Sequence, residues 1–369
     1  MSATIGTTEQ PEILIVGGSL AGLLTAHALA EAGIRSSIFE RASAHRPSGA
    51  ALAVDDDQLT AALGSTRATA ALGRTPSRHG SAVPATWAQL HQGLRAAAER
   101  DPLIRLHHDT KVTAVAQDEK WARVTLADGS HVTGSAVIGA DGYRSIVRRE
   151  VDPERPDSTF AGYTLWLGIA NEVDVPPQAS WPRSLDFRTS GGYYLLGYPL
   201  AADDNTLTPG RRRLGWAWYD ASRNDLLRKA GSVEGRTVRR SLRPDQIPDQ
   251  VYDELAREAR RYWPSPWVQA IVDSIERRAV TCTPISEYVP NRLTRGRLAL
   301  VGDAAHVPTP MTGMGFATAV DDAASIAAVL HHCTHDTITV ALDEYAKARL
   351  APARSLVQSG QSFSRNFAA

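Results

Sequence analysis

The chain contains little cysteine: Cys282 and Cys333 are the only two among 369 residues. They form no CxxC pair and no spacing typical of a metal site, so we predict neither a disulfide framework nor a metal centre. Both are expected to be free thiols, buried or idle, in a reducing compartment.

The sequence also lacks a hydrophobic run of about 18 residues, the length that a membrane-spanning helix needs. Residues 1–12 are polar and do not show the charged and apolar regions of a signal peptide. We therefore expect a cytoplasmic protein with no membrane partner.

An excess of one charge sign is absent as well. Lys plus Arg and Asp plus Glu each number 40, which argues against a nucleic-acid or acidic-membrane partner, since either would favour a basic face. The run at residues 211–213, three arginines after Pro209-Gly210, is expected to be a solvated turn. The length of 369 residues predicts two or three domains.

The first clear pattern is a strand, a glycine-rich turn, a helix and a second strand. Residues 13–16 are a short apolar run typical of a buried parallel strand. Residues 20–32 have helical character and Gly33 ends them, and residues 36–39 form the next strand. This is a βαβ unit.

The remaining elements are predicted from periodicity and turn residues. Residues 42–85 show no clear period and are expected to be loops and short helices. The other predictions are an amphipathic helix at 86–99, an antiparallel meander at 111–134, buried strands at 136–138 and 298–301, strands at 163–169, 184–188, 193–198 and 214–218, and helices at 251–262, 315–331 and 338–363.

The turn at residues 17–22 reads Gly-Gly-Ser-Leu-Ala-Gly. In a dinucleotide-binding fold, glycines make the tight turn, let the backbone approach the pyrophosphate and let helix and strand pack closely. The helix N-terminus then offers N–H groups and partial positive charge to the phosphates. Ser19 takes the middle position, where a small hydrogen-bonding side chain preserves the function. Glu40 follows the second strand and is placed to bind the adenosine ribose, so we predict dinucleotide binding.

Two further motifs follow buried strands. Residues 139–145 read Gly-Ala-Asp-Gly-Tyr-Arg-Ser, which taken alone is interpreted as an ordinary turn. Residues 302–306 read Gly-Asp-Ala-Ala-His, and Asp303 at the strand end suits a sugar or ribityl hydroxyl. The glycine-rich helix start after Pro310 directs its dipole at an anion such as reduced flavin. His306 is either a catalytic base or a packed, hydrogen-bonded histidine, and we favour the second.

Together, the three motifs resemble those of the single-component FAD-dependent aromatic hydroxylases, the para-hydroxybenzoate hydroxylase-like group, over nearly the whole chain. Finer segments are similar to the 2,6-dihydroxypyridine 3-monooxygenase branch. These segments are Gly17-Gly18-Ser19, Trp87 with Leu90 and Leu94, residues 215–219 and residues 241–244.

The resemblance implies an α/β fold. It consists of a Rossmann-like FAD-binding domain, with a parallel sheet and a small antiparallel meander, an inserted antiparallel-sheet substrate domain and C-terminal helices. We expect the FAD-binding domain to comprise residues 1–75, 86–160 and 281–369, and the substrate domain residues 76–85 and 161–280. A monomer or homodimer is expected.

The resemblance also implies noncovalent FAD held by all three motifs. Asp141 and Gly142 would serve both FAD and the passing nicotinamide cofactor, Asp303 would bind the ribityl chain, and Pro310 would help to frame the isoalloxazine. The expected cofactor-binding residues are Gly17, Gly18, Ser19, Leu20, Ala21, Gly22, Glu40, Arg41, Asp141, Gly142, Asp303, Gly313, Met314 and Gly315.

Three departures from the family pattern concern the substrate pocket. Trp87 stands where many relatives carry an arginine near FAD, Leu167 replaces an arginine of close relatives, and residues 51–80 match poorly. His79, in that segment, is a weak candidate for the pocket. Besides Pro310, the candidate pocket side chains lie on predicted strands, where sheet core is the alternative interpretation: Tyr193, Tyr198, Trp216 and Trp218.

The implied reaction is a monooxygenation. NADH or NADPH reduces FAD, O2 adds to give a C4a-hydroperoxide, and this oxygenates an electron-rich hydroxyaromatic or N-heteroaromatic small molecule. The cofactor carries the chemistry while the protein orients the ring and excludes water. The sequence identifies no catalytic base.

Other functions use part of the same pattern. A flavin-dependent epoxidase of an indole or alkene natural-product intermediate differs only in the pocket, and a non-catalytic flavin-binding sensor would lack turnover. A halogenase is disfavoured because the first lysine is Lys111 and residues 216–218 lack a following Ile-Pro. An NAD-dependent dehydrogenase would leave Asp303 unexplained.

Overall fold

The computed structural model describes residues 12–43, 51–76, 83–178, 180–202 and 206–368, and its first sheet has six strands. All strands of this sheet are parallel except β17. Every residue of β1 and β9 is buried, so these strands are continuous apolar runs and do not alternate. The strand order is β17 (Thr294–Arg295), β18 (Leu298–Leu300), β9 (Ala136–Gly139), β1 (Ile13–Val16), β2 (Ser36–Phe39) and β5 (Ile104–His107).

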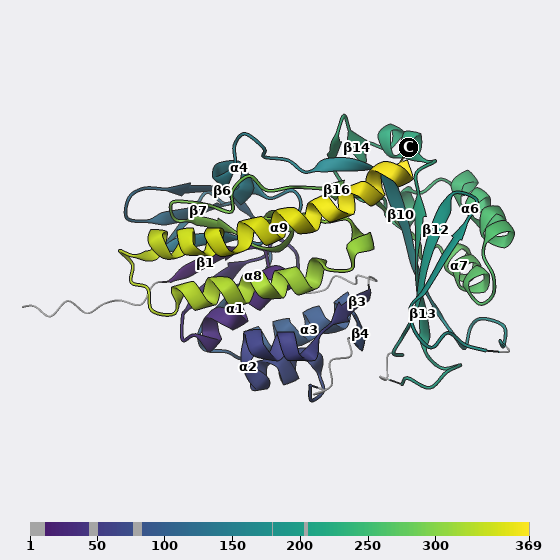
Figure 1. Ribbon diagram of the computed structural model, residues 1–369, viewed down its shortest axis with the longest axis horizontal. Coiled ribbons are helices and arrows are strands. Elements are labelled where there is room, and N and C mark those ends of the chain that lie inside the picture. Colours follow the sequence, from purple (N-terminus) through teal and green to yellow (C-terminus); the bar gives the residue numbers. More distant parts are fainter. Residues whose placement is uncertain (1–11, 44–50, 77–82, 179, 203–205, 369) are drawn as a thin grey trace, which may run out of the picture.

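Four helices pack together beside this sheet (Figure 1). They are α1 (Leu20–Glu31), α2 (Asp56–Leu72), α3 (Trp87–Ala98) and α8 (Gly315–Leu330). The predicted meander is present, and it contacts β9 through β7 and the short helix α4 (Ile146–Val151) through β6. Its strands are β6 (Val112–Gln117), β7 (Ala122–Leu126) and β8 (His131–Gly134).

The second sheet is antiparallel, as predicted, and has two different faces. Helices α6 (Asp249–Tyr262) and α7 (Trp267–Glu276) cover one face, where Trp216 and Trp218 are buried. The other face carries Tyr163 and Tyr219. The strand order is β11 (Asp186–Ser190), β12 (Tyr193–Leu200), β13 (Arg213–Asp220), β10 (Thr159–Asn171) and β16 (Thr281–Glu287).

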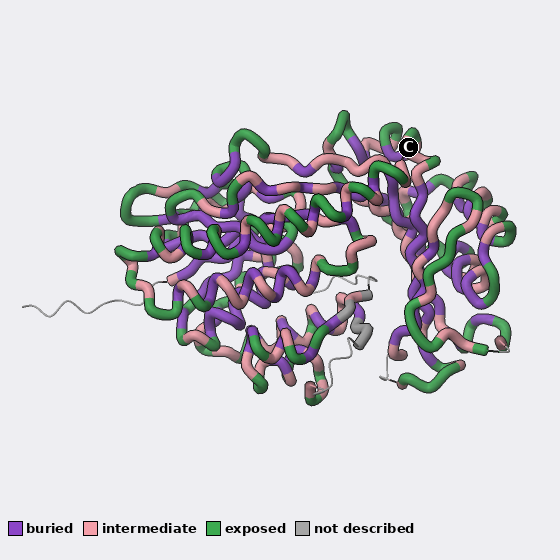
Figure 2. Tube along the Cα trace, viewed as in Figure 1, coloured by how far each residue is buried: buried purple, intermediate pink, exposed green. Residues whose placement is uncertain are grey.

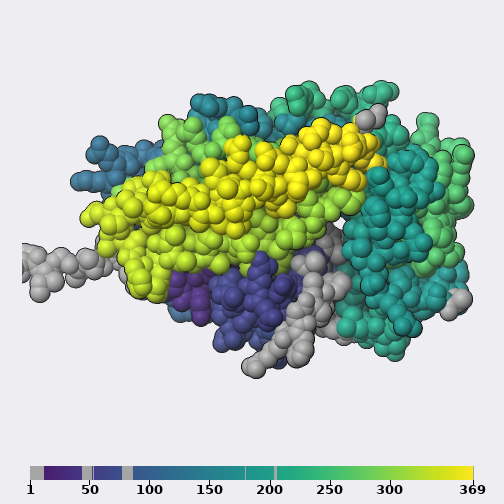
Figure 3. All heavy atoms as spheres, in the orientation of Figure 1, coloured from purple at the N-terminus to yellow at the C-terminus, as the bar shows by residue number. Residues whose placement is uncertain are grey.

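The long helix α9 (Ile338–Ala368) joins the two halves of the molecule. It contacts α8 beside the first sheet and β10 of the second. Figure 3 shows it in yellow along one face of the molecule as far as the second sheet. Figure 2 shows the buried segments gathered in the strands of both sheets and in the helix faces against them. Phe363 and Phe367, near the C-terminal end of α9, therefore lie against the second sheet.

Residues 56–72, where loops and short helices were expected, contain two helical segments that meet at a kink. This segment forms α2, with a non-helical glycine at Gly64 (φ 76°). Asp55 caps the helix by accepting hydrogen bonds from the backbone N–H groups of Asp57 and Gln58. The helix shows little hydrophobic period because alanine, the strongest helix former, supplies much of its buried side.

The solvated turn expected at residues 211–213 is corrected at Arg212, whereas Arg211 is exposed. Arg212 is buried and pairs with buried Glu172 at 2.7 Å. The Glu172 carboxylate also accepts hydrogen bonds from the backbone N–H groups of Gly210 and Arg212. A charged side chain enters the interior here because its partner satisfies it there.

The remaining elements are short. The described residues contain no helix both long and apolar enough to cross a membrane. Cys282 is buried, Cys333 is half-buried, and both are free thiols. The short elements are β3 (Ala51–Val54), β4 (Val83–Thr86), α5 (Asn224–Lys229), β14 (Val233–Glu234), β15 (Thr237–Val238) and the 3-10 turns η1 (Pro244–Gln246), η2 (Gly302–Ala304) and η3 (Pro310–Thr312).

Candidate functional site

The turn between β1 and α1 can be built only with glycine at two positions. Gly17 has φ +105°, and a Cβ there would lie 2.5 Å from the carbonyl oxygen of Ala140. A Cβ on Gly22 would lie 1.9 Å from the carbonyl oxygen of Gly17. These contacts make the tight turn and the close helix–strand packing of a dinucleotide site.

Ser19 fits the turn without strain. It is the N-cap of α1, with φ −79°, and its side chain is exposed and caps no backbone group. Serine therefore replaces glycine here at no conformational penalty. Of the next two predicted residues, Leu20 is buried in the core, and Ala21 lies against Gly302 of the third motif.

Glu40 is fixed at the end of β2. Its carboxylate accepts hydrogen bonds of 2.7 Å from the backbone N–H groups of Gly18 and Ala42. A Cβ on Gly18 would lie 2.9 Å from the Glu40 Cβ, so a side chain at position 18 would push this carboxylate away.

A cavity of about 410 Å³ opens at the carboxyl ends of these strands, where ligands of doubly wound sheets bind. It brings the first, second and third motifs together. Arg41, Arg95, Lys111 and Arg144 add positive charge suited to a pyrophosphate. The predicted residues that line it are Gly17, Gly18, Ser19, Glu40, Arg41, Asp141, Gly142 and Asp303.

The second motif is stabilised by hydrogen bonds from the start of the helix that follows it, α4. Asp141 accepts hydrogen bonds from the Ser145 hydroxyl and, at 2.7 Å, from the backbone N–H of Ile146. Burial raises the pKa of the Asp141 carboxyl, and these two hydrogen bonds oppose that rise. Gly142 follows with φ +79°, so the segment is a built turn at the cavity.

Arg148 ties the second motif to the third. Its buried guanidinium donates to the backbone carbonyls of Tyr143, Asp303 and Ala304. It also lies 4.3 Å from the centre of the Tyr288 ring, a cation–π contact. Sequence reasoning missed this residue, since an arginine on a short surface-like helix gives no sign of burial.

Helix α3 contributes a further wall, for which the sequence pointed to Trp87 but not to His91 or Arg95. Trp87, His91 and Arg95 recur at intervals of four residues and line the cavity. His91 stacks on Trp87 with ring centres 4.4 Å apart, and its Nε2 donates to the Gly18 carbonyl at 3.0 Å. Trp87, a departure expected to concern the substrate pocket, therefore lines the cavity that the three motifs share.

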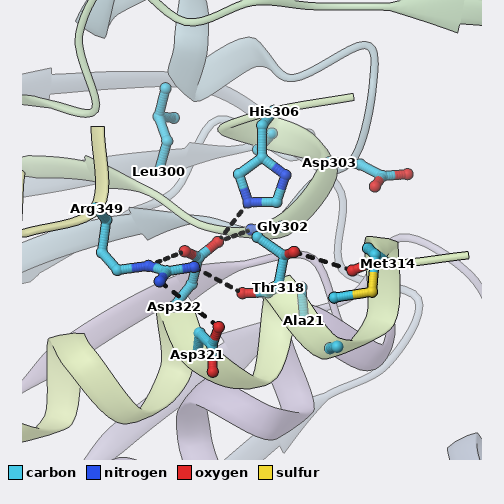
Figure 4. Close-up of polar contacts among 12 residues, drawn as sticks. Ala21, Leu300, Gly302, Asp303, His306, Met314, Thr318, Asp321, Asp322 and Arg349 are labelled. Carbon is cyan, nitrogen blue, oxygen red and sulfur yellow. Dashed lines mark hydrogen bonds and ion pairs between the residues drawn. The ribbon is translucent and has the colours of Figure 1, made fainter. Parts of the chain in front are cut away.

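The two polar residues of the third motif, Asp303 and His306, point to opposite sides. Asp303 is exposed toward the cavity, whereas His306 is fully buried and its Nε2 donates to Asp322 at 2.7 Å. Figure 4 shows Asp303 pointing away from His306. The interpretation of His306 as a packed, hydrogen-bonded histidine is therefore confirmed.

The loop after the third motif lies between the two sheets. Thr309, the N-cap of η3, is hydrogen-bonded to the Tyr163 hydroxyl of the second sheet. Met311 packs on the aromatic face of that sheet. The predicted loop residues are accessible or partly so: Pro310 and Gly313 are exposed, Met314 is 49% exposed and Gly315 is half-buried.

The predicted pocket side chains lie on two different faces of the second sheet. Tyr193, Trp216 and Trp218 pack under α6 and α7, and Trp216 donates to Ser274 of α7 at 3.1 Å. Their assignment to the substrate pocket is corrected, because strand alternation turns them toward α6 and α7 and away from the face on which Met311 packs.

Tyr198 is the predicted pocket side chain on the other face. Gly197 beside it faces α7, since a Cβ there would meet Trp267, and alternation turns Tyr198 to the opposite side. Tyr194 and Leu167, the second departure, share that face. His79 lies outside the described residues.

Comparison with known proteins decides the family. The family described as FAD binding domain matches residues 10–360. The chain belongs to this family. The predictions of an FAD-binding domain and of the family resemblance are confirmed.

Within the family, similar relatives are hydroxylases. The 2,6-dihydroxypyridine 3-monooxygenase of Paenarthrobacter nicotinovorans is 27% identical, with 88% of this chain and 83% of the relative covered. The FAD-dependent urate hydroxylase of Klebsiella pneumoniae is also 27% identical, with 93% and 87% covered.

Solved structures share the fold. The 2,6-dihydroxypyridine-3-hydroxylase from Arthrobacter nicotinovorans has a TM-score of 0.76 at 21% identity, covering 98% of this chain and 93% of its own. Klebsiella pneumoniae HpxO, complexed with FAD and uric acid, has a TM-score of 0.72 at 21% identity, covering 100% and 91%. The predicted α/β fold is confirmed.

Proposed function

We propose that this protein is an FAD- and NAD(P)H-dependent monooxygenase that inserts one oxygen atom from O2 into an electron-rich hydroxyaromatic or N-heteroaromatic small molecule. The observation that carries the proposal is the continuity of the site. The glycine turn, Asp141 and Asp303 line one cavity, and the loop after Asp303 leads to the aromatic face of the second sheet.

The polar groups that line the cavity fit the ADP half of FAD. Gly17 and Gly18 line the cavity beside the N-terminus of α1, where a pyrophosphate would bind. Glu40 would accept from the ribose hydroxyls, exchanging its present hydrogen bonds for them, and Asp303 would hold the ribityl chain. The residues that line the cavity fall within the segments predicted for the FAD-binding domain.

Bound FAD would supply the redox chemistry, accepting a hydride from NADH or NADPH and activating O2 once reduced. The chain's own part is electrostatic and steric. Helix α8 begins at Gly315, and its N-terminal dipole favours negative charge near that end of the helix. Pro310 and Gly313 would limit access from solvent at that point.

The aromatic face of the second sheet would orient the substrate ring. Tyr194 packs against Phe363 and Phe367 with ring centres 5.5 and 5.0 Å apart. Burial raises the pKa of Tyr163 to about 12, so its hydroxyl stays protonated near neutral pH and serves as a hydrogen-bonding group, not a base. An apolar aromatic wall of this kind favours flat rings over aliphatic substrates.

The hydroxylases named above support this substrate class, because uric acid and dihydroxypyridine are electron-rich nitrogen heterocycles. The test is to purify the protein with FAD and follow NADH and NADPH oxidation with phenols, hydroxypyridines, purines and indoles. Substrate-stimulated oxidation with an oxygenated ring product is expected. A protein that cannot bind FAD contradicts the proposal.

Two other outcomes identify the alternatives. An epoxide formed from an indole or alkene, without hydroxylated product, indicates the epoxidase. A yellow protein with neither stimulated oxidation nor product indicates the flavin-binding sensor.

A further inference from the structure

A fully buried carboxylate lies directly behind the third motif. Asp322 of α8 accepts three hydrogen bonds: 2.7 Å from His306 Nε2, 2.9 Å from the Gly302 backbone N–H and 2.9 Å from Arg349 Nε. Figure 4 shows these groups converging on one side chain. Burial alone raises the pKa of Asp322, but His306, Arg349 and Gly302 outweigh it and hold the pKa below its usual value.

Hydrogen bonds hold both the backbone N–H and the backbone carbonyl of Gly302. The Gly302 N–H donates to Asp322, and its carbonyl accepts from the N–H groups of Ala305 and His306 at 2.8 and 2.9 Å. Gly302 has φ +55°, and a Cβ there would lie 2.6 Å from the Ala21 Cβ. This turn is therefore fixed by its hydrogen bonds and by contact with the first motif.

The next residue along the chain is Asp303, which projects to the cavity. We infer that Asp322 is a positioning residue for the flavin: it fixes the Gly302 peptide and so the direction of the Asp303 carboxylate toward FAD. Arg349 of α9 helps to hold the Asp322 carboxylate in place, and the ion pair between them also connects α9 to α8. The inference rests on the proposed role of Asp303 in binding FAD.

Asparagine cannot replace this carboxylate. The Gly302 N–H and the Arg349 Nε–H can only donate, and they approach different oxygens of Asp322. An amide in either orientation places its NH2 group against one of these two donors. Asp322→Asn therefore keeps the shape of the side chain and breaks the network.

The experiment measures the dissociation constant of FAD from the apoprotein by flavin fluorescence, well below the unfolding temperature of each variant. Asp322→Asn is expected to weaken FAD binding about tenfold or more. The matched control is Asp321→Asn, whose side chain is 48% exposed and 3.6 Å from Arg349. This variant is expected to stay within about twofold of the unchanged protein.

A double-mutant cycle separates positioning from general loosening of the fold. Asp303→Ala alone is expected to weaken FAD binding, and adding Asp322→Asn to it is expected to change little more. Equal weakening by Asp322→Asn with and without Asp303 overturns the inference, as does an Asp322→Asn variant that binds FAD normally. Failure of the unchanged protein to bind FAD is a different result, which contradicts the proposed function itself.

His306 provides a second check. Gln at this position retains an amide N–H that can donate to Asp322, whereas Leu retains only bulk. His306→Gln is expected to keep FAD binding close to normal and His306→Leu to weaken it. Equal binding by the two variants contradicts the role of this hydrogen bond.

Discussion

The guanidinium of Arg148 donates a hydrogen bond of 3.1 Å to the backbone carbonyl of Ala304. Through this contact and its bond to the Tyr143 carbonyl, one side chain joins the loops that follow β9 and β18. Burial lowers the pKa of Arg148, and the backbone carbonyls and the Tyr288 ring around the guanidinium stabilise its positive charge.

Arg148→Met is expected to destabilise the protein by about 2–4 kcal/mol, because several buried carbonyls lose their donor together. It should also weaken FAD binding, since both cavity loops lose their common support. Urea unfolding and FAD titration measure the two effects. The control is Arg149→Met, which breaks only an exposed ion pair with Asp157 and should change stability by less than about 0.5 kcal/mol. Equal effects from the two variants would contradict the assigned role of Arg148.

Gly17→Ala is expected to abolish FAD uptake. The substitution combines an unfavourable positive φ with a Cβ 2.5 Å from a backbone oxygen, so the turn must move. Backbone strain of this kind costs about 1–3 kcal/mol. Ser19→Ala, two residues on, meets neither problem and removes only a hydroxyl group, so its loss of FAD affinity should be much smaller than that of Gly17→Ala. FAD titration of both variants checks the prediction, and normal binding by Gly17→Ala would show that the turn tolerates a side chain.

The stability of the apoprotein is expected to fall as the pH is lowered below about 6.5, because of His27. This side chain is buried, donates from Nε2 to the Leu94 carbonyl at 2.9 Å, and has its pKa lowered by burial. Below the unfolded pKa the unfolded chain binds the extra proton, so stability rises with pH across this window.

The measurement is urea unfolding from pH 5 to 7.5. His27 can contribute a slope of at most about 1.4 kcal/mol per pH unit. His27→Gln should reduce the slope, with His91, whose pKa burial also lowers, contributing part of the remainder, whereas exposed His131→Gln should leave the profile unchanged. An unaltered profile in His27→Gln would assign the pH dependence to other groups.

Adjacent tyrosines on β12 test which face binds the substrate. Tyr194→Ala removes a ring from the aromatic face and is expected to raise the KM for the aromatic substrate about three- to tenfold. Tyr193→Ala removes a ring that packs on Trp218 and Tyr262, so it should lower stability and leave KM unchanged. Steady-state kinetics and thermal unfolding distinguish the two, and a KM effect confined to Tyr193→Ala would reverse the assignment of the faces.

The sequence by itself determined the features that depend on local backbone chemistry. Gly22 is required by a contact within one βαβ unit, Gly17 adopts a positive φ in the turn, and the apolar runs of β1 and β9 report burial on both faces of a parallel sheet. These requirements are expressed as residue types at fixed spacing, so the FAD family and the α/β fold could be predicted.

The tertiary structure decided which side chains face one another. Strand alternation does not say which face meets the cofactor, so Tyr193 and Trp216 were predicted for the wrong side of the sheet. The burial of Arg148 and of Asp322 depends on partners far away in the chain, among them Ala304 and Arg349. A charged residue is stable in the interior only when such partners surround it, and no local pattern in the sequence records them.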